Sequence, residues 1–245
     1  PTTSGLTAQR LQETTSQNQC LARFFSVLDG ATQVGIVRVK YLVTQVGTVG
    51  KSTTVYATYQ PFQRKAFYTR GRFWVFYSDG LYMVYSTSVD GVTWTNPTVV
   101  RPCLSGDCFS VWFDGVYVHY AYAYDSPIYY RRGTPNADGT VSWNGEQTVS
   151  TLYNKANFPF VSVDSNGYVW IGYRETHPGL YYYPHVIKSG SNDGTWGTTP
   201  SGFPYQLKGF PTDTNYWRVS IIPLTVGKML ALYTCLLYTS DAADE

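Results

Sequence analysis

Runs of aromatic and aliphatic residues alternate with polar residues along much of the chain, and short glycine-containing turns separate the runs. Residues 65–94 contain three such runs, KAFYT, RFWVFYS and LYMVYSTS, which are divided by the dipeptides Arg-Gly and Asp-Gly. Alternation with a period of two is typical of half-buried strands, and Asp-Gly between such runs is a strong hairpin signal. The pattern therefore predicts short antiparallel strands joined by tight turns.

The same unit recurs, with further copies starting at FSVWF (109–113), FPFVSVD (158–164) and WRVSIIPL (217–224). The third copy carries a longer loop over residues 175–183. Equivalent turn glycines mark the four copies: Gly71, Gly115, Gly167 and Gly227. Four antiparallel strands in a unit of ~45 residues form the blade of a β-propeller, a fold of typically 4–8 blades. We predict an all-β fold, an incomplete β-propeller of four-stranded antiparallel blades with about four to five blades present. A β-sandwich is the alternative, but it does not require the repeated order of strands and turns.

The two ends of the chain differ from the repeats. Residues 1–19 are rich in Thr, Ser and Gln and are expected to form a linker or an irregular segment. Strand-like stretches between residues 20 and 60 predict an irregular earlier blade, so the partial propeller is expected to span 20–234. The tail 235–245, CLLYTSDAADE, resembles a translated sequencing adapter and is expected to be non-native, which makes the chain a fragment; a short acidic natural tail is the alternative.

Composition supports the all-β prediction and limits the partners. The chain has 23 Tyr, 12 Phe, 7 Trp and 22 Gly, which suit pleated surfaces and tight turns. Its 18 Lys and Arg against 16 Asp and Glu form no basic cluster, so nothing favours nucleic acid or an anionic membrane. No apolar run reaches the roughly 18 residues that a membrane span needs.

Cysteine and histidine positions give two further expectations. Cys103 and Cys108 are separated by LSGD, a spacing that can close a small disulfide loop in an oxidising compartment; two unpaired thiols are the alternative. His177 and His185 stand too far along the chain from other ligand types to indicate a metal site. No motif implies a cofactor.

The turn between the third and fourth strands carries a family resemblance. Residues 88–94, SVDGVTW, resemble the Asp-box of sialidase-type BNR repeats, S-x-D-x-G-x-T-W, and looser versions stand at 136–143 and 191–196. An Asp carboxylate can accept backbone N–H groups in such a turn, Gly takes a positive φ, and Trp packs beneath the hairpin. The residues expected to play these structural parts are Ser88, Asp90, Gly91, Thr93, Trp94, Asp138, Trp143, Asp193, Gly194 and Trp196.

The resemblance implies an extracellular or cell-surface protein that binds a carbohydrate or a cell-surface glycoconjugate. In that family the Asp-boxes lie on the face away from the active site. Successive turns of an antiparallel blade alternate between its two ends, so the turns between second and third strands lie at the opposite end. That end is the expected binding face.

Sialidases clamp the substrate carboxylate with arginines and use a Tyr nucleophile assisted by Glu, with an Asp as acid/base. The resemblance therefore implies catalytic roles for Glu175, Asp79 and Asp125 and substrate-binding roles for Arg174, Arg218, Tyr181 and Tyr182. Each also has a structural interpretation: the Asp residues as turn formers, Arg174-Glu175 as a solvated pair, Arg218 as a partner of backbone carbonyls, and the Tyr cluster as blade packing. The family's FRIP-like arginine motif is not found.

Two functions remain open from the sequence. One is a non-catalytic propeller that binds glycans or surface proteins; the other is a sialidase-type exo-glycosidase acting on terminal acidic sugars. The two differ in whether Arg174, Glu175 and Arg218 converge beside Asp79 or Asp125.

Overall fold

The structure is a computed structural model. It describes residues 6–16, 19–29, 32–40, 47–58, 60, 62–102, 108–179, 181–207 and 218–233, and for the strands before residue 41 it describes the backbone alone. The described residues form strands and turns without a helix. They divide into two compact units, Pro1–Thr48 and Val49–Glu245.

The larger unit begins with a four-stranded antiparallel sheet in the order β4-β5-β6-β7. Its strands are β4 (Ala66–Thr69), β5 (Arg72–Ser78), β6 (Tyr82–Ser88) and β7 (Thr98–Pro102). The hairpins close at the dipeptides that the alternating pattern predicts, and Gly71 and Gly91 have positive φ angles of 69° and 74°. Glycine adopts this conformation without the steric cost of a Cβ atom.

The second sheet follows directly and has a divided outer edge. Its strands are β8 (Phe109–Phe113), β9 (Val118–Tyr122), β11 (Ile128–Pro135), β12 (Val141–Trp143) and β13 (Gln147–Val149). The order is β8-β9-β11, and both β12 and β13 pair with β11. The outer strand is therefore interrupted at residues 144–146.

The third sheet has the order β10-β14-β15-β16-β17, and a fourth begins with a two-stranded sheet, β18-β19. These strands are β10 (Tyr124–Ser126), β14 (Ala156–Val163), β15 (Val169–His177), β16 (Tyr181–Lys188), β17 (Tyr205–Gln206), β18 (Val219–Pro223) and β19 (Met229–Tyr233). The predicted long loop at 175–183 is wrong in extent, because β15 continues to His177 and β16 starts at Tyr181.

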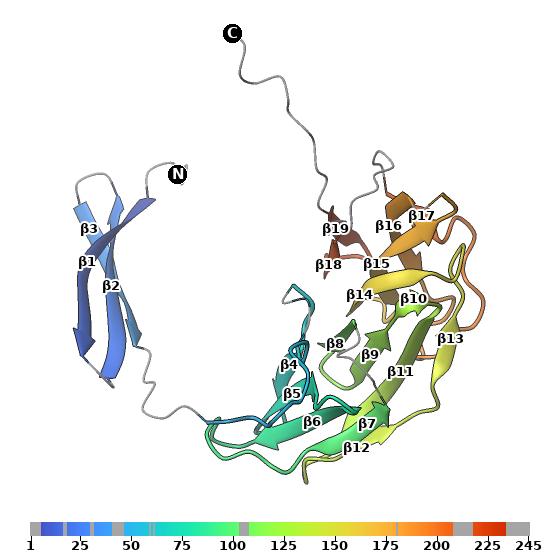
Figure 1. Ribbon diagram of the computed structural model, residues 1–245. Helices are drawn as coiled ribbons and strands as arrows, with labels where there is room; N and C mark the ends of the chain where they lie inside the picture. Colours follow the sequence, from blue (N-terminus) through green and yellow to red (C-terminus); the bar gives the residue numbers. More distant parts are fainter. Residues whose placement is uncertain are drawn as a thin grey trace. The chain divides into compact units, whose positions relative to one another are not determined.

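The first strands of successive sheets lie next to one another: β4 beside β8, β8 beside β14, and β14 beside β18 (Figure 1). Side chains between the sheets form hydrophobic clusters, one around Trp74, Phe76 and Tyr120 and another around Tyr130 and Tyr173. Consecutive antiparallel sheets with adjoining first strands are the blades of a β-propeller. The predicted fold class is confirmed.

The smaller unit is a three-stranded antiparallel sheet of β1 (Leu6–Ser16), β2 (Gln19–Asp29) and β3 (Thr32–Lys40). The segment 1–19, expected to be irregular, thus contains a strand, since its backbone pairs with the next segment. The second strand-like stretch, residues 52–59, forms turns rather than a strand over its described residues 52–58. The sheets β4-β5-β6-β7 onward belong to the unit that starts at Val49, and the predicted start of the propeller at residue 20 stays a prediction. The tail 235–245 lies outside the described residues.

The three turns that resemble Asp-boxes have the hydrogen bonds that their chemistry suggests. Asp90 Oδ1 accepts the N–H groups of Val92 and Thr93, at 2.8 and 2.7 Å, and the Ser88 hydroxyl at 2.8 Å. These bonds favour the ionised form and lower the pKa of Asp90. In the other two turns the carboxylates of Asp138 and Asp193 accept the N–H and hydroxyl groups of the threonine two residues later, Thr140 and Thr195.

The Trp residues of these turns differ in depth. Trp196 is 3% exposed and packs edge-on against Tyr130, with ring centroids 5.8 Å apart. Trp94 and Trp143 are half-buried. The glycines Gly139 and Gly194 have φ angles of 93° and 83°. The Asp, Ser and Thr side chains of these turns therefore hold hairpins together.

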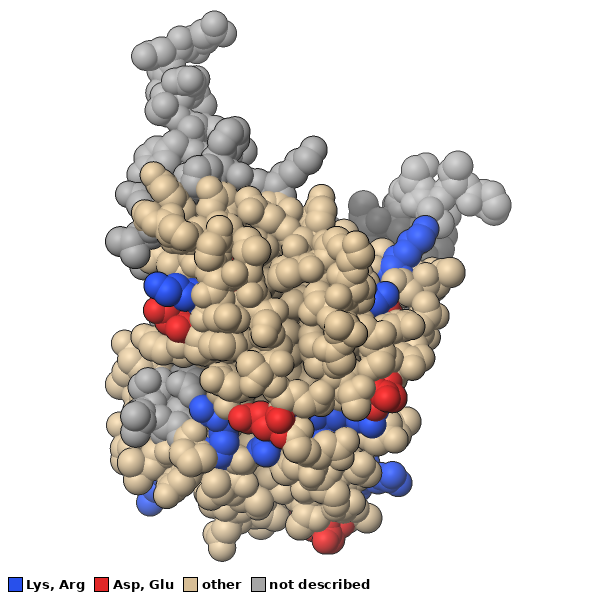
Figure 2. Space-filling view, turned by 90° about the vertical axis from the view of Figure 1, so that its right-hand side faces the viewer, with Lys and Arg blue, Asp and Glu red and all other residues tan. Residues whose placement is uncertain are grey.

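The remaining expectations concern the disulfide, a membrane span and the distribution of charge on the surface. Cys108 is buried with a free thiol, which speaks against the predicted disulfide, but Cys103 lies outside the described residues and the pairing stays a prediction. Among the described residues no helix has the length and apolar character to cross a membrane. Figure 2 shows a face on which charged side chains of both signs lie in small separate groups among uncharged residues.

Candidate functional site

Two arginines converge on one aromatic ring at the start of the third blade. The guanidinium carbon of Arg218 lies 3.7 Å from the ring centre of Phe158, and that of Arg174 lies 4.6 Å from it. Phe158 stands in β14 with φ of 57°, where the pairing register with β15 shifts between Asn157 and Phe160. A non-glycine residue at positive φ within a strand is strained and is held by its surroundings. The Phe158 ring at this bulge therefore contacts both cations.

Further groups surround this arginine pair. The ring of Tyr182 lies 4.3 Å from the Arg174 guanidinium, and the Asp125 carboxylate is close enough to raise the pKa of Arg174 by its charge. Asp125 itself is exposed, has φ of 50°, and donates its backbone N–H to the side chain of Asn157 at 3.0 Å. The structure thus brings Arg174, Arg218, Asp125 and Tyr182 to one place.

Positive charge is concentrated here in a poorly solvated setting. Burial, and then repulsion from Arg218, lower the pKa of Arg174 to about 10. Burial also lowers the pKa of Lys65 to about 7, and it raises the pKa of Cys108 to about 11 although Lys65, Arg218 and Arg174 all favour the thiolate. The two arginines on the Phe158 ring therefore define a region of positive potential that an anion would stabilise.

The connecting segment 60–65 helps to hold these cations. Arg218 Nε donates to the Gln60 side-chain oxygen at 2.8 Å, and Gln63 Nε2 donates to the carbonyl of Pro159 at 2.5 Å. The Lys65 ammonium donates to the Phe109 carbonyl and lies 3.6 Å from the centre of that residue's ring. This segment, which precedes the first blade, therefore contacts the first strands of the second and third blades. It also contacts Arg218, the residue before β18.

Glu175 does not join the arginine pair. Arg174 and Glu175 are consecutive in β15, so their side chains point to opposite faces of the sheet. The Glu175 carboxylate is 0% exposed, and its Oε1 accepts the Thr151 hydroxyl at 2.5 Å and the Tyr153 N–H at 2.8 Å. The expected convergence of Arg174, Glu175 and Arg218 is therefore not found.

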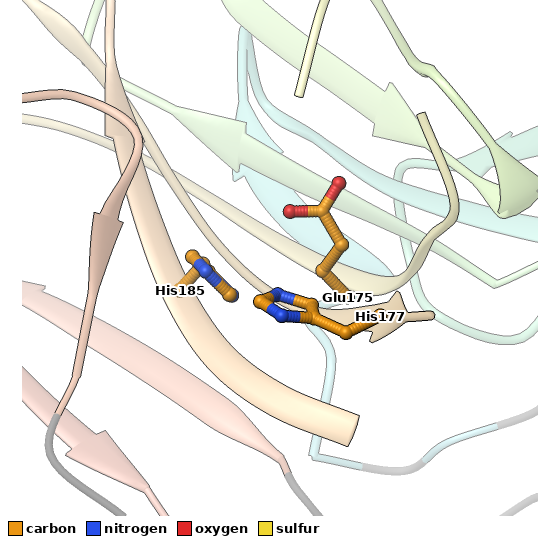
Figure 3. A group of neighbouring side chains, drawn as sticks. All are labelled: Glu175, His177 and His185. Atoms are coloured by element: carbon orange, nitrogen blue, oxygen red, sulfur yellow. The ribbon is translucent and has the colours of Figure 1, made fainter. Parts of the chain in front are cut away.

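Glu175 instead lies beside two histidines, as Figure 3 shows. One ligand atom from each of Glu175, His177 and His185 lies within 4.8 Å of the others. The sequence-based expectation that His177 and His185 lack a partner ligand is wrong. Alternation along β15 and pairing with β16 bring the three side chains together on one face.

The other predicted site residues, Asp79 and Tyr181, have different surroundings. Asp79 lies in the turn between β5 and β6, where its Oδ1 accepts the N–H groups of Leu81 and Tyr82 at 2.8 and 2.7 Å. This is the bonding of a turn former. Tyr181 is 45% exposed and pairs with His177, so its side chain lies on the Glu175 face rather than with Tyr182.

For three residues of these clusters, the neighbouring sequence does not predict a place in a site. Lys65 reads as the first residue of a strand, and nothing in Phe158-Pro159 predicts a positive φ. The sequence around Cys108 suggests only a disulfide with Cys103. Their positions depend on contacts between segments that are distant in sequence.

Comparisons with known proteins complete the description. A scan against protein-family models and a search of curated proteins found no match. Among solved structures, the catalytic domain of a GH62 alpha-L-arabinofuranosidase from Coprinopsis cinerea is similar at 13% identity and a TM-score of 0.46, over 95% of this chain and 86% of that one. A GH43B protein from Bacteroides ovatus is similar at 12% identity and 0.45, over 91% and 47% of the two chains. A Hadza microbial sialidase is similar at 12% identity and 0.44, over 84% and 48%.

Proposed function

We propose that this propeller binds a carbohydrate with an acidic group, and that the arginine pair recognises the acid. The observation that carries the proposal is the convergence of Arg174 and Arg218 on the ring of Phe158. Guanidinium groups bind carboxylates with two parallel hydrogen bonds, and a poorly solvated setting strengthens the attraction.

The two arginines have different parts in this proposal. Arg218 is half-buried and meets the ligand, whereas Arg174 is 7% exposed and adds its charge from beneath Phe158 and Tyr182. The tyrosine ring offers an apolar face beside the cations, which suits the carbon skeleton of a sugar. The combination favours a terminal sugar acid over a neutral sugar.

The direct test is calorimetric titration with a methyl glycoside of sialic acid. The variant Arg218→Gln is expected to weaken binding by roughly tenfold or more, because a charge-assisted hydrogen bond is worth about 1.5–3 kcal/mol. Arg70→Gln is the matched control, since Arg70 is exposed in the turn between β4 and β5, at the Asp-box end of the blade. Equal losses in both variants, or no binding by the unaltered chain, would contradict the proposal.

Binding is proposed in preference to hydrolysis. A sialidase mechanism needs a Glu to assist the nucleophile beside the arginines, and Glu175 faces the other side of β15. The chain is therefore expected to release no fluorophore from a fluorogenic sialoside beyond the buffer rate. Release that Arg218→Gln abolishes and Arg70→Gln preserves would instead support the exo-glycosidase alternative.

A further inference from the structure

The cluster of Glu175, His177 and His185 has the composition and position of a ligand set. Two imidazoles and one carboxylate bind zinc in many proteins, in which a fourth position stays open to water. The three side chains come from two neighbouring strands, β15 and β16, which hold their backbones in a regular antiparallel register. Rigid strands position ligands more accurately than loops do.

One oxygen of Glu175 is held in place and the other is available. Oε1 accepts two hydrogen bonds, from the Thr151 hydroxyl and the Tyr153 N–H, so the orientation of the carboxylate is set. Oε2 is buried and has no hydrogen-bond partner among the described residues. A buried, unpaired carboxylate oxygen is costly, and a bound cation would remove that cost.

Each histidine offers one ring nitrogen for an ion. His185 Nδ1 lies 3.2 Å from the carbonyl of Tyr183, so this nitrogen carries the proton and donates it, which leaves Nε2 with a lone pair. His177 Nε2 is buried, and no residue that the structure describes bonds it. Metal-binding histidines commonly have their second nitrogen bonded to a carbonyl in this way.

Aromatic rings enclose the cluster. The His177 ring packs against Tyr153 and Tyr183, each with ring centroids 4.4 Å away, and the His185 ring stacks on Tyr173 at 5.5 Å. His185 is 1% exposed. These rings pack against both imidazoles, but none of them bonds the unpartnered atoms of Glu175 and His177 within the described part of the chain.

We propose that Glu175, His177 and His185 form a zinc-binding site. Zn–N and Zn–O bonds of about 2.0–2.2 Å in a tetrahedral site place ligand atoms about 3.4 Å apart. The three ligand atoms lie within 4.8 Å of one another, so the largest separation would have to shorten by up to about 1.4 Å when the ion binds. Calcium and magnesium are less suited, because they prefer all-oxygen sites.

The bound ion would connect two parts of the propeller. Thr151 and Tyr153 belong to the connection between β13 of the second blade and β14 of the third, and both orient Glu175. Zinc on Glu175 and the two histidines would therefore fix this connection against the hairpin of β15 and β16. The proposal is independent of acidic-sugar binding, which uses the opposite face of β15.

The test is zinc binding to the whole chain after chelator treatment and dialysis. The unaltered chain is expected to bind one zinc ion, measured by calorimetry and by elemental analysis. Glu175→Gln and His177→Gln are each expected to weaken zinc binding by roughly 10- to 100-fold. Glu146→Gln is the matched control, because Glu146 is exposed and bonds only the Tyr122 hydroxyl among the described residues, at 3.1 Å.

A cobalt(II) spectrum separates this site from zinc on thiols. Cobalt in the proposed site gives d–d absorption without a thiolate charge-transfer band. Should Glu175→Gln fail to fold, as judged by circular dichroism, His177→Gln at its half-buried position supplies the test. Zinc affinity unchanged in a folded variant, a thiolate band, or no stoichiometric zinc in the unaltered chain would each overturn the proposal.

Discussion

Replacing Phe158 by leucine tests whether its ring holds the two arginines. Leucine keeps most of the apolar volume and leaves the positive φ of this position in place, but it lacks the aromatic face. Phe158 is 6% exposed, so both cation contacts lie in a poorly solvated place. The substitution therefore removes the attraction between ring and guanidinium while it changes packing modestly.

The magnitude follows from the two distances. The Arg218 contact at 3.7 Å is expected to contribute about 1–2 kcal/mol and the longer Arg174 contact at 4.6 Å about 0.5–1 kcal/mol. A hydrophobic replacement of similar volume adds less than about 1.5 kcal/mol. Phe158→Leu should therefore lower the free energy of unfolding by about 2–4 kcal/mol.

A double-mutant cycle isolates the contacts from the packing loss. Urea unfolding at pH 7 of Phe158→Leu, Arg218→Gln and the double variant is expected to give a coupling energy of about 1–2 kcal/mol. The same cycle with Arg174→Gln should give a smaller value. Coupling below about 0.3 kcal/mol in both cycles, or a larger coupling for Arg174, would refute the reasoning.

Two further predictions concern stability. Tyr130→Phe should lower the free energy of unfolding by about 1–3 kcal/mol relative to Tyr129→Phe. The reason is that the buried His119 Nδ1, which lies 2.8 Å from the Tyr130 hydroxyl, then has no donor. Equal urea midpoints for the two variants would count against this. The pKa of Lys65 is lowered to about 7 by burial, so between pH 7 and 8.5 the unfolded chain binds more protons than the folded chain, and stability should rise by about 1–2 kcal/mol over that window. Above it the raised pKa of the Cys108 thiol acts in the opposite direction. Urea unfolding at the two pH values should show the rise in the unaltered chain and lose it in Lys65→Met; an equal rise in both would contradict the assignment.

The blades were predictable because their signals are local. Asp79-Gly80, Asp90-Gly91 and the other turn dipeptides determine where each hairpin closes, and the alternating runs between them determine which face is buried. The β17 strand and the divided outer edge of the second blade had no comparable signal. Both features depend on pairing with neighbouring strands, which the local sequence does not encode.

The sites were predictable only in part, and the extent of β15 explains why. A loop over 175–183 would have allowed Arg174 and Glu175 to point the same way. Because β15 continues to His177, strict alternation sends them to opposite faces and brings Glu175 to the histidines instead. Because β15 extends further than the sequence pattern predicts, the residues expected in one site lie in two.

The arginine pair depends on contacts that no short window of sequence contains. Phe158 adopts its positive φ at a bulge in β14, and Gln60, over 150 positions earlier in the chain, bonds Arg218. Arg174 and Arg218 could be named from the sequence as candidates, but the ring between them could not.

The central claim is that the arginine pair recognises the acid group of a sugar. The most direct measurement compares, by calorimetric titration at pH 7, a sialic acid methyl glycoside with the methyl ester of the same compound, which differs only in its carboxyl charge. The account predicts that the free acid binds at least roughly tenfold more tightly than the ester. Equal affinities, or tighter binding of the ester, would contradict it.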